Sequence, residues 1–180
     1  MHGARMDNGS VSAALVLIGA PGAGKSSVLE ALTTLLETEG ISYGAIESEQ
    51  LAWGLPLLAA DDWIPQLAAV ASLQRRAGRT LFLVAATAEN AAELQGVIHA
   101  LDAERVIVVC LRASPEVAAA RIAAREPDAW PGKQRLIDHA RILAASMPVL
   151  DGIDLIIDTD TRVAQHVAHE VREALGRLLE

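Results

Sequence analysis

The segment Gly19–Ser26, which reads Gly-Ala-Pro-Gly-Ala-Gly-Lys-Ser, has the residue types and spacing that most clearly imply chemistry. It matches the pattern G-x-x-x-x-G-K-[ST] of the P-loop, or Walker A motif. Glycines allow backbone angles and a close approach that a side chain would block, so successive N–H groups can turn inward around phosphate oxygens. The motif therefore predicts a site for the phosphates of a nucleotide, which we expect to be ATP with Mg²⁺.

Each part of this motif has an expected role. Lys25 reaches the β- and γ-phosphates, and the hydroxyl of Ser26 is a ligand of Mg²⁺. The helix that begins near Lys25 adds the positive end of its dipole. A glycine-rich turn that binds nothing is the alternative, but the apolar run before the loop and the amphipathic segment after it favour the P-loop. The predicted nucleotide-binding residues of the loop are Gly19, Pro21, Gly22, Ala23, Gly24, Lys25, Ser26 and Ser27.

Two further pairs of charged residues have informative spacing. Glu47 and Glu49 are two residues apart, which places both side chains on one side of an extended chain. Arg121 and Arg125 are four residues apart, which places both side chains on one face of a helix. A solvated acidic turn and ordinary surface arginines are the alternative interpretations of these two pairs.

Apolar runs alternate with helical patterns along the chain, and these elements must position the charged residues. Continuous apolar runs at 80–86 and 105–111 are typical of a parallel sheet that is covered on both faces. The alternation predicts an α/β fold with right-handed crossovers. Expected strands are 14–18, 41–46, 80–86, 105–111 and 153–158, and expected helices are 25–38, 61–77, 89–101, one from Pro115, 134–147 and one capped by Thr161.

Composition limits the class of protein. The chain has 180 residues with a net charge of −8, which suits one domain and disfavours a nucleic-acid partner. The single cysteine, Cys110, cannot form an internal disulfide, and no apolar run is long enough to span a membrane. We therefore expect a cytoplasmic protein. Residues 1–12 are polar and without periodicity, so they are predicted to be a flexible tail before a domain at 13–180.

Other classes of P-loop protein fit less well. The GTPase signatures D-x-x-G and N-K-x-D do not occur in the sequence. The apolar run 80–86 is followed by Thr87 rather than by an acid, which argues against a large motor ATPase.

These features together resemble the small P-loop kinases related to nucleoside monophosphate kinases, shikimate kinase, gluconate kinase and chloramphenicol phosphotransferase. The resemblance covers residues 13–180 and depends on the P-loop, the acidic segment Glu47–Glu49, the R-x-x-x-R pattern at Arg121–Arg125 and a last strand that leads to a terminal helix. The chain looks closest to AAA family ATPase proteins of this size. The resemblance implies a three-layer P-loop NTPase fold: a five-stranded parallel sheet in order 2-3-1-4-5, helices on both faces, and a short lid at about 126–133, where a plain helix–helix loop is the alternative.

The resemblance also implies roles for individual residues. Glu47 would bind Mg²⁺ and Glu49 would act on the acceptor hydroxyl as a base, or the two roles would be exchanged. Arg121 would stack on adenine, and Arg125 would reach the transferred phosphate. Asp160 would lie in the loop around adenine, although a helix-capping role explains it equally well. The acceptor is expected near a group of residues for which core packing is the alternative, namely Trp53, Pro56, Asp61, Asp62 and Trp63.

We therefore expect ATP- and Mg²⁺-dependent phosphoryl transfer to a hydroxyl group of a small molecule. A nucleotide-binding regulatory protein, or a weak ATPase without kinase activity, is the alternative, because both acids of the acidic segment are glutamates and no acid follows residues 80–86. A kinase that acts on RNA ends or nucleotide sugars is a third candidate.

Overall fold

A parallel sheet of five strands forms the centre of the computed structural model, which describes residues 12–180. The strands lie in the order β2-β3-β1-β4-β5, and every pairing between neighbours is parallel. The strands are β1 (Ala13–Ile18), β2 (Gly44–Glu47), β3 (Leu81–Ala86), β4 (Arg105–Arg112) and β5 (Leu155–Asp158). The predicted fold class and strand order are therefore confirmed.

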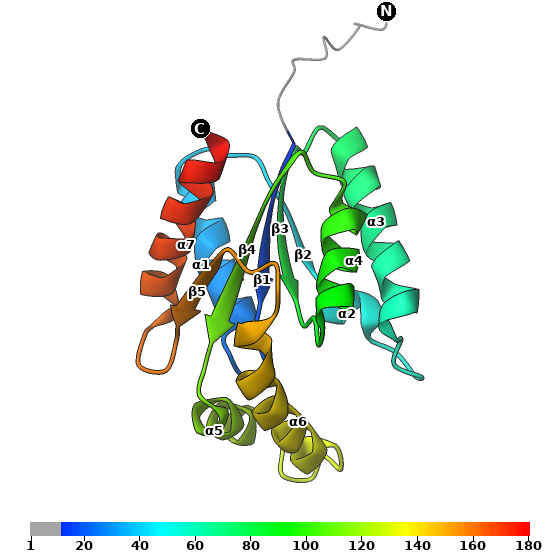
Figure 1. The fold of residues 1–180 in the computed structure, drawn as a ribbon, viewed down its shortest axis with the longest axis vertical. Helices are drawn as coiled ribbons and strands as arrows, with labels where there is room; N and C mark the ends of the chain where they lie inside the picture. Colours follow the sequence, from blue (N-terminus) through cyan, green and yellow to red (C-terminus); the bar gives the residue numbers. More distant parts are fainter. Residues whose placement is uncertain (1–11) are drawn as a thin grey trace, which may run out of the picture.

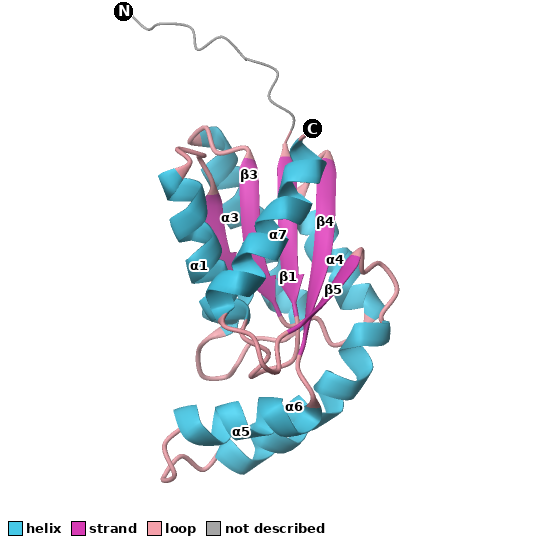
Figure 2. Ribbon diagram, turned by 90° about the vertical axis from the view of Figure 1, so that its left-hand side faces the viewer, coloured by secondary structure: helices cyan, strands magenta, loops and turns pink. Residues whose placement is uncertain are grey.

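Helices cover both faces of the sheet, which makes three layers (Figure 1). Helices α1 and α7 lie side by side on one face, and α3 and α4 lie on the other (Figures 1 and 2). No helix among residues 12–180 is both long and apolar enough to cross a membrane. The helices are α1 (Lys25–Thr38), α2 (Ser48–Ala52), α3 (Ala60–Arg76), α4 (Ala91–Leu101), α5 (Pro115–Arg125), α6 (Lys133–Ser146) and α7 (Ala164–Leu179), with a 3-10 turn at Met147–Val149.

The two central strands explain why the sheet is stable. All six residues of β1 and all six of β3 are buried, as their uninterrupted apolar sequences require. Burial of a side chain such as Leu15 or Phe82 contributes roughly 1.5–3 kcal/mol to stability. The loop that follows β1, which is the P-loop, therefore starts from a fully buried strand of the sheet.

Three details of the predicted elements were wrong. Strand β2 begins at Gly44 rather than at residue 41, because the N–H of Ile41 donates to Leu36 O and ends α1. Residues 48–52 form the short helix α2, which the sequence analysis missed. The last helix begins at Ala164 with Val163 as its N-cap residue, so Thr161 does not cap it.

The predicted N-terminal tail, residues 1–12, lies outside the described residues except for Ser12. That residue is buried, and its N–H and hydroxyl both bond to Glu104, at 3.2 and 3.1 Å. Ser12 therefore belongs to the folded domain.

Helices α5 and α6 form a hairpin beyond the carboxyl ends of the strands (Figure 2). The hairpin has a small apolar core of its own, made by Ala119, Ile122, Ile137 and Ala140. Residues 126–132 form the turn at its tip, within the segment predicted to be a lid. The hairpin places one face of α5 opposite the P-loop.

Candidate active site

The P-loop joins β1 to α1 and needs its glycines for two separate reasons. Gly22 and Gly24 have φ angles of 84° and 98°, in the left-handed region that side chains rarely adopt. A Cβ atom at Gly22 would also lie 2.5 Å from the carbonyl oxygen of Ala118 on α5. The loop therefore curls tightly against α5 and leaves no room for a side chain at this point.

The first turn of α1 offers backbone donors to an anion. The N–H of Val28 donates to Gly24 O at 2.9 Å, and this is the first hydrogen bond of the helix. The N–H groups of Lys25, Ser26 and Ser27 precede it and have no acceptor within the helix. No side chain caps this end of α1, so three donors and the positive end of the helix dipole face the same cleft.

Lys25 is the one buried cation of the cleft among the described residues. Its side chain is 7% exposed, and its ammonium group donates to Gly19 O at 2.9 Å. The same Nζ atom lies 3.4 Å from Oε1 of Glu49, with which it forms an ion pair. Burial lowers the pKa of Lys25 below its ordinary value, and the charge of Glu49 opposes that effect in part.

Glu49 lies on α2 and is held from two sides. Its Oε1 atom accepts a hydrogen bond from the Thr87 hydroxyl at 3.0 Å in addition to its contact with Lys25. Burial raises the pKa of Glu49, but the charge of Lys25 and the hydrogen bonds from Thr87 and Lys25 outweigh burial, so the pKa lies below its ordinary value. Glu49 is therefore an ionised carboxylate beside the P-loop at neutral pH.

The two glutamates do not share one side of an extended chain, as the sequence analysis expected. Glu47 ends β2 in an extended conformation, whereas Ser48 begins α2, so Glu49 is turned away from the direction of the strand. Glu47 is half-buried and does not line the cleft at the P-loop. Its charge still acts on Lys25, where it raises the pKa.

These elements enclose a cleft of about 160 Å³ at the carboxyl edge of the sheet. Arg125, at the end of α5, contributes a guanidinium group to the cleft and pairs with Glu126 at 2.7 Å. Ser26 is exposed to the cleft in the first turn of α1. The cleft thus joins backbone donors, two cations and one carboxylate, and its residues are Pro21, Gly22, Gly24, Lys25, Ser26, Ser27, Glu49, Arg125 and Leu136.

Arg121 ties the P-loop to the loop after β5. Its guanidinium group donates to Gly22 O at 3.1 Å and to Thr159 O at 2.6 Å. Thr159 is buried, and its hydroxyl donates to Ala23 O at 3.0 Å. A cavity of about 190 Å³ adjoins Arg121 and Thr159 and shares Ser27 with the phosphate cleft, so it continues that cleft toward α7.

Asp160 was predicted to lie near the nucleotide, whereas Thr159 and Thr87, which also contact site residues, were not predicted. The side chain of Asp160 accepts a hydrogen bond from Ser114 N at 2.7 Å, just before α5, and it does not cap α7, which follows it. Thr159 and Thr87 were not recognised as site residues. Each is a hydroxyl residue directly after a strand that ends at the P-loop edge, and that position was the signal that could have found them.

The tip of the α5–α6 hairpin is fixed by Lys133. Its ammonium group donates to Ala123 O, Glu126 O and Asp128 Oδ1 at 2.7–2.8 Å, so its charge stabilises the end of α5. His139 on α6 lies 2.9 Å from Glu89, in the loop between β3 and α4. The hairpin therefore contacts the body of the domain on the side opposite α7.

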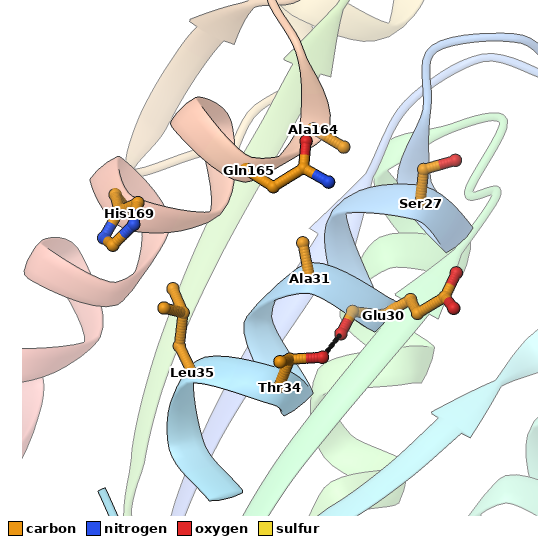
Figure 3. A pocket seen from close by; sticks show the side chains of 8 residues that line it. All are labelled: Ser27, Glu30, Ala31, Thr34, Leu35, Ala164, Gln165 and His169. Atoms are coloured by element: carbon orange, nitrogen blue, oxygen red, sulfur yellow. Dashed lines mark hydrogen bonds between the residues drawn. The ribbon is translucent and has the colours of Figure 1, made fainter. Parts of the chain in front are cut away.

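A larger groove of about 330 Å³ lies between α1 and α7 (Figure 3). Glu30 and Thr34 from α1 lie along one side of it, and Gln165 and His169 from α7 lie along the other (Figure 3). No lysine or arginine lines this groove. It therefore lacks the cations that a phosphate site needs, and the smaller cleft at the P-loop is the candidate active site.

Comparison with known proteins places the chain in a protein family. A family model described as an AAA domain matches residues 15–145. No curated protein sequence matches the chain significantly.

Solved structures that share this fold include small P-loop kinases of the kind that the sequence resemblance implied. A gluconokinase from Sinorhizobium meliloti 1021 is 24% identical with a TM-score of 0.65, over 93% of this chain and 94% of that one. A Mycobacterium tuberculosis APS kinase in complex with AMPPNP and APS is 22% identical with a TM-score of 0.68, over 92% and 98%. A shikimate kinase from Acinetobacter baumannii in complex with shikimate is 18% identical with a TM-score of 0.61, over 93% and 94%.

Proposed function

The chain belongs to the AAA domain family, and from that premise we propose that it transfers the γ-phosphate of ATP to a hydroxyl group of a small molecule. The observation that carries the proposal is the pair of Lys25 and Glu49, 3.4 Å apart in the phosphate-sized cleft. A cation for the donor and a carboxylate for the acceptor are the two charges that such a reaction needs. The fold shared with the gluconokinase, the APS kinase and the shikimate kinase supports the same reaction class.

The donor nucleotide is bound by the P-loop in this proposal. The N–H groups of Lys25, Ser26 and Ser27, which have no acceptor within α1, bind phosphate oxygens together with the Lys25 ammonium group. Arg125 neutralises charge on the transferred phosphate from the opposite wall. The cavity beside Arg121 and Thr159 takes the adenosine part, with Arg121 fixed along its wall.

Mg²⁺ fits the residues that are present. Ser26 exposes its hydroxyl at the cleft, and Glu47 is half-buried at the end of β2. No three His, Cys, Asp or Glu side chains within residues 12–180 are grouped to hold a metal ion by themselves. Mg²⁺ commonly takes one or two protein ligands together with phosphates and water, and when bound it supplies charge that neutralises the phosphates. We assign Ser26 to it as a direct ligand and Glu47, which lies outside the lining of the cleft, as a partner that would act through water.

Glu49 is the candidate base for the acceptor hydroxyl. The Thr87 hydroxyl holds one carboxylate oxygen, and Lys25 keeps the group ionised. A phosphate near Lys25 would compete with Glu49 for the ammonium group, which would free the carboxylate to accept a proton. Catalysis by such a group is mostly a matter of positioning.

A nucleotide-binding regulatory protein without kinase activity is the second candidate. It is favoured by the placement of Glu47 and Glu49, which do not face the cleft as a pair. A cytoplasmic location and a lid function of the hairpin tip stay predictions.

Replacement of Lys25 by alanine tests the proposal. We expect Lys25→Ala to lose ATP-dependent product formation while its circular dichroism spectrum stays that of the folded domain. Arg76→Ala is the matched control, because Arg76 is an exposed cation at the far end of α3. Full activity in the Lys25 variant would refute the assignment. Nucleotide binding with no product from any acceptor would favour the regulatory alternative.

A further inference from the structure

Lysine and arginine are missing from most of the segments on the side of the cleft where an acceptor would bind. No lysine or arginine occurs at residues 26–74 or at residues 80–104. These stretches include β2, α2, almost all of α3, β3 and α4. Arg75, which follows the first stretch, lies in the last turn of α3, over the ring of Phe82 and far along the helix from its first turn.

Carboxylates occupy the same region instead. Asp61 and Asp62 are exposed in the first turn of α3, which follows α2 after a loop of seven residues. Glu89 lies in the loop after β3 and pairs with His139, and Glu93 bonds to Asn90 at the start of α4. Together with Glu47 and Glu49, these make six carboxylates from the elements named above and the loop between β3 and α4, and none is paired with an arginine.

The loop between α2 and α3 adds an apolar surface beside these acids. Trp53, Leu55 and Leu57 are 78%, 102% and 73% exposed, whereas Trp63 nearby is buried. The loop closes on itself, because the N–H of Leu58 donates to Ala52 O at 3.1 Å at the end of α2. Three large apolar side chains exposed within five residues mark a contact surface rather than a packing site.

The opposite wall of the cleft supplies the positive charges. Arg125 lines the phosphate cleft, Lys133 is bonded to the end of α5, and Arg135 is exposed on α6. Lys25 is buried at the base of the P-loop. Positive charge is thus concentrated at the donor phosphates and on the hairpin, and it is missing from β2, α2 and the first turn of α3.

From this distribution we infer that the acceptor is an alcohol without an anionic group, either uncharged or carrying a protonated amine, with an apolar portion that contacts the loop Trp53–Leu58. The inference rests on the proposed phosphoryl transfer and narrows its acceptor class. A carboxylate, phosphate or sulfate on the acceptor would meet like charge from Glu49 at the cleft and from the acids in the first turn of α3, and β2, α2 and that first turn offer no lysine or arginine to pair it. An amine would be attracted by the same groups.

The electrostatic part can be tested without any turnover, by collisional quenching of tryptophan fluorescence. In a Trp130→Phe variant of the full chain, Trp53 is the exposed tryptophan and Trp63 is buried. We expect Cs⁺ to quench Trp53 better than iodide, with each quencher scaled to its effect on N-acetyltryptophanamide. The Cs⁺ preference should decrease in Asp61→Asn/Asp62→Asn. It should persist in Asp151→Asn/Glu173→Gln, which changes the net charge equally at two other exposed acids. Equal quenching, or better quenching by iodide, would overturn the inference.

The acceptor class is tested with matched alcohols that share a skeleton and differ in one group: methyl, aminomethyl or carboxylate. Binding is read as protection of Trp53 from acrylamide in the presence of Mg-AMPPNP, and transfer is read as labelled phosphate in the product with Mg-ATP. We expect the methyl and aminomethyl compounds to bind about tenfold more tightly than the carboxylates, because of the like charges around the loop.

Two results would overturn this inference: tightest binding by carboxylates, or no protection of Trp53 by any compound. Phosphorylation of a carboxylate would leave the proposed kinase activity intact and remove only the acceptor class. Binding of uncharged or aminated alcohols without any product would contradict the proposed kinase activity and leave the inferred ligand class intact.

Discussion

Replacement of Glu49 by glutamine separates the contact that the structure shows for this carboxylate, its ion pair with Lys25, from the role of base that we propose for it. In the wild-type protein Glu49 pairs with Lys25 across 3.4 Å, and incoming phosphates must compete for the same ammonium group. Glutamine keeps the size of the side chain and removes that competition. We therefore expect Glu49→Gln to bind Mg-AMPPNP more tightly than the wild type while it loses turnover.

The size of the affinity change follows from the exposure of the pair. The side chain of Glu49 is 56% exposed, so solvent screens its charge, whereas that of Lys25 is 7% exposed and is screened little. Ion pairs of this kind contribute roughly 0.2–1 kcal/mol, and we take the upper end because Lys25 is buried. The expected gain in affinity is therefore up to about fivefold. Loss of a general base lowers turnover by roughly 10²-fold or more.

Isothermal titration with Mg-AMPPNP and a product assay with Mg-ATP measure the two effects in the same protein. Glu30→Gln is the matched control, since Glu30 is exposed on α1 outside the phosphate cleft. Weaker or unchanged nucleotide binding together with full turnover would refute the reasoning. That result would mean that Glu49 neither restrains Lys25 nor acts on the acceptor.

Other changes have equally direct outcomes. Gly22→Ala places a Cβ atom 2.5 Å from Ala118 O at a φ of 84°, so we expect a loss of roughly 1–3 kcal/mol in thermal unfolding and weak Mg-ATP binding, whereas Ala20→Gly should retain binding. Thr159→Val removes the hydroxyl that donates to Ala23 O and accepts from Arg121, which should cost about 1–3 kcal/mol of stability, measured by urea unfolding against Thr161→Val as an exposed control. The lowered pKa of Glu49 means that its contribution to stability is complete above its ordinary value of 4.5 and is lost as pH falls through the lower folded value. The wild type should thus lose more stability than Glu49→Gln below about pH 4.5, and parallel acid-unfolding curves would contradict this.

The sequence predicted the fold well because its strongest signals are local. The runs at β3 and β4 are apolar without interruption, and a strand that is buried on both faces has no other composition available. The strand order followed from the resemblance to small P-loop kinases rather than from the runs themselves, and the P-loop pattern predicted where the cleft opens. Gly22 and Gly24 were predictable for the same reason, since their backbone angles exclude most other residues.

The parts that the sequence did not predict depend on contacts between distant segments. Glu49 was expected on an extended chain, but a helix of five residues begins at Ser48, and such a short helix has almost no periodic signal. Thr159 contacts Ala23, which is 136 residues away, and Thr87 contacts Glu49, which is 38 residues away. Neither contact leaves a pattern in the sequence, because each depends on how the strands align at one edge of the sheet.

The placement of charge around the cleft follows from this architecture and bears on which elements would serve the donor and the acceptor in the proposed reaction. P-loop amides, Lys25 and Arg125 gather positive charge where the donor phosphates would lie, and Glu49 of α2 is the carboxylate that lines the same cleft. Phosphoryl transfer needs negative charge to be stabilised on the donor and a proton to be removed from the acceptor. The P-loop, α2 and α5 each contribute a different part of the cleft, so in the proposed reaction the tasks of holding the phosphate and activating the hydroxyl would fall to different elements.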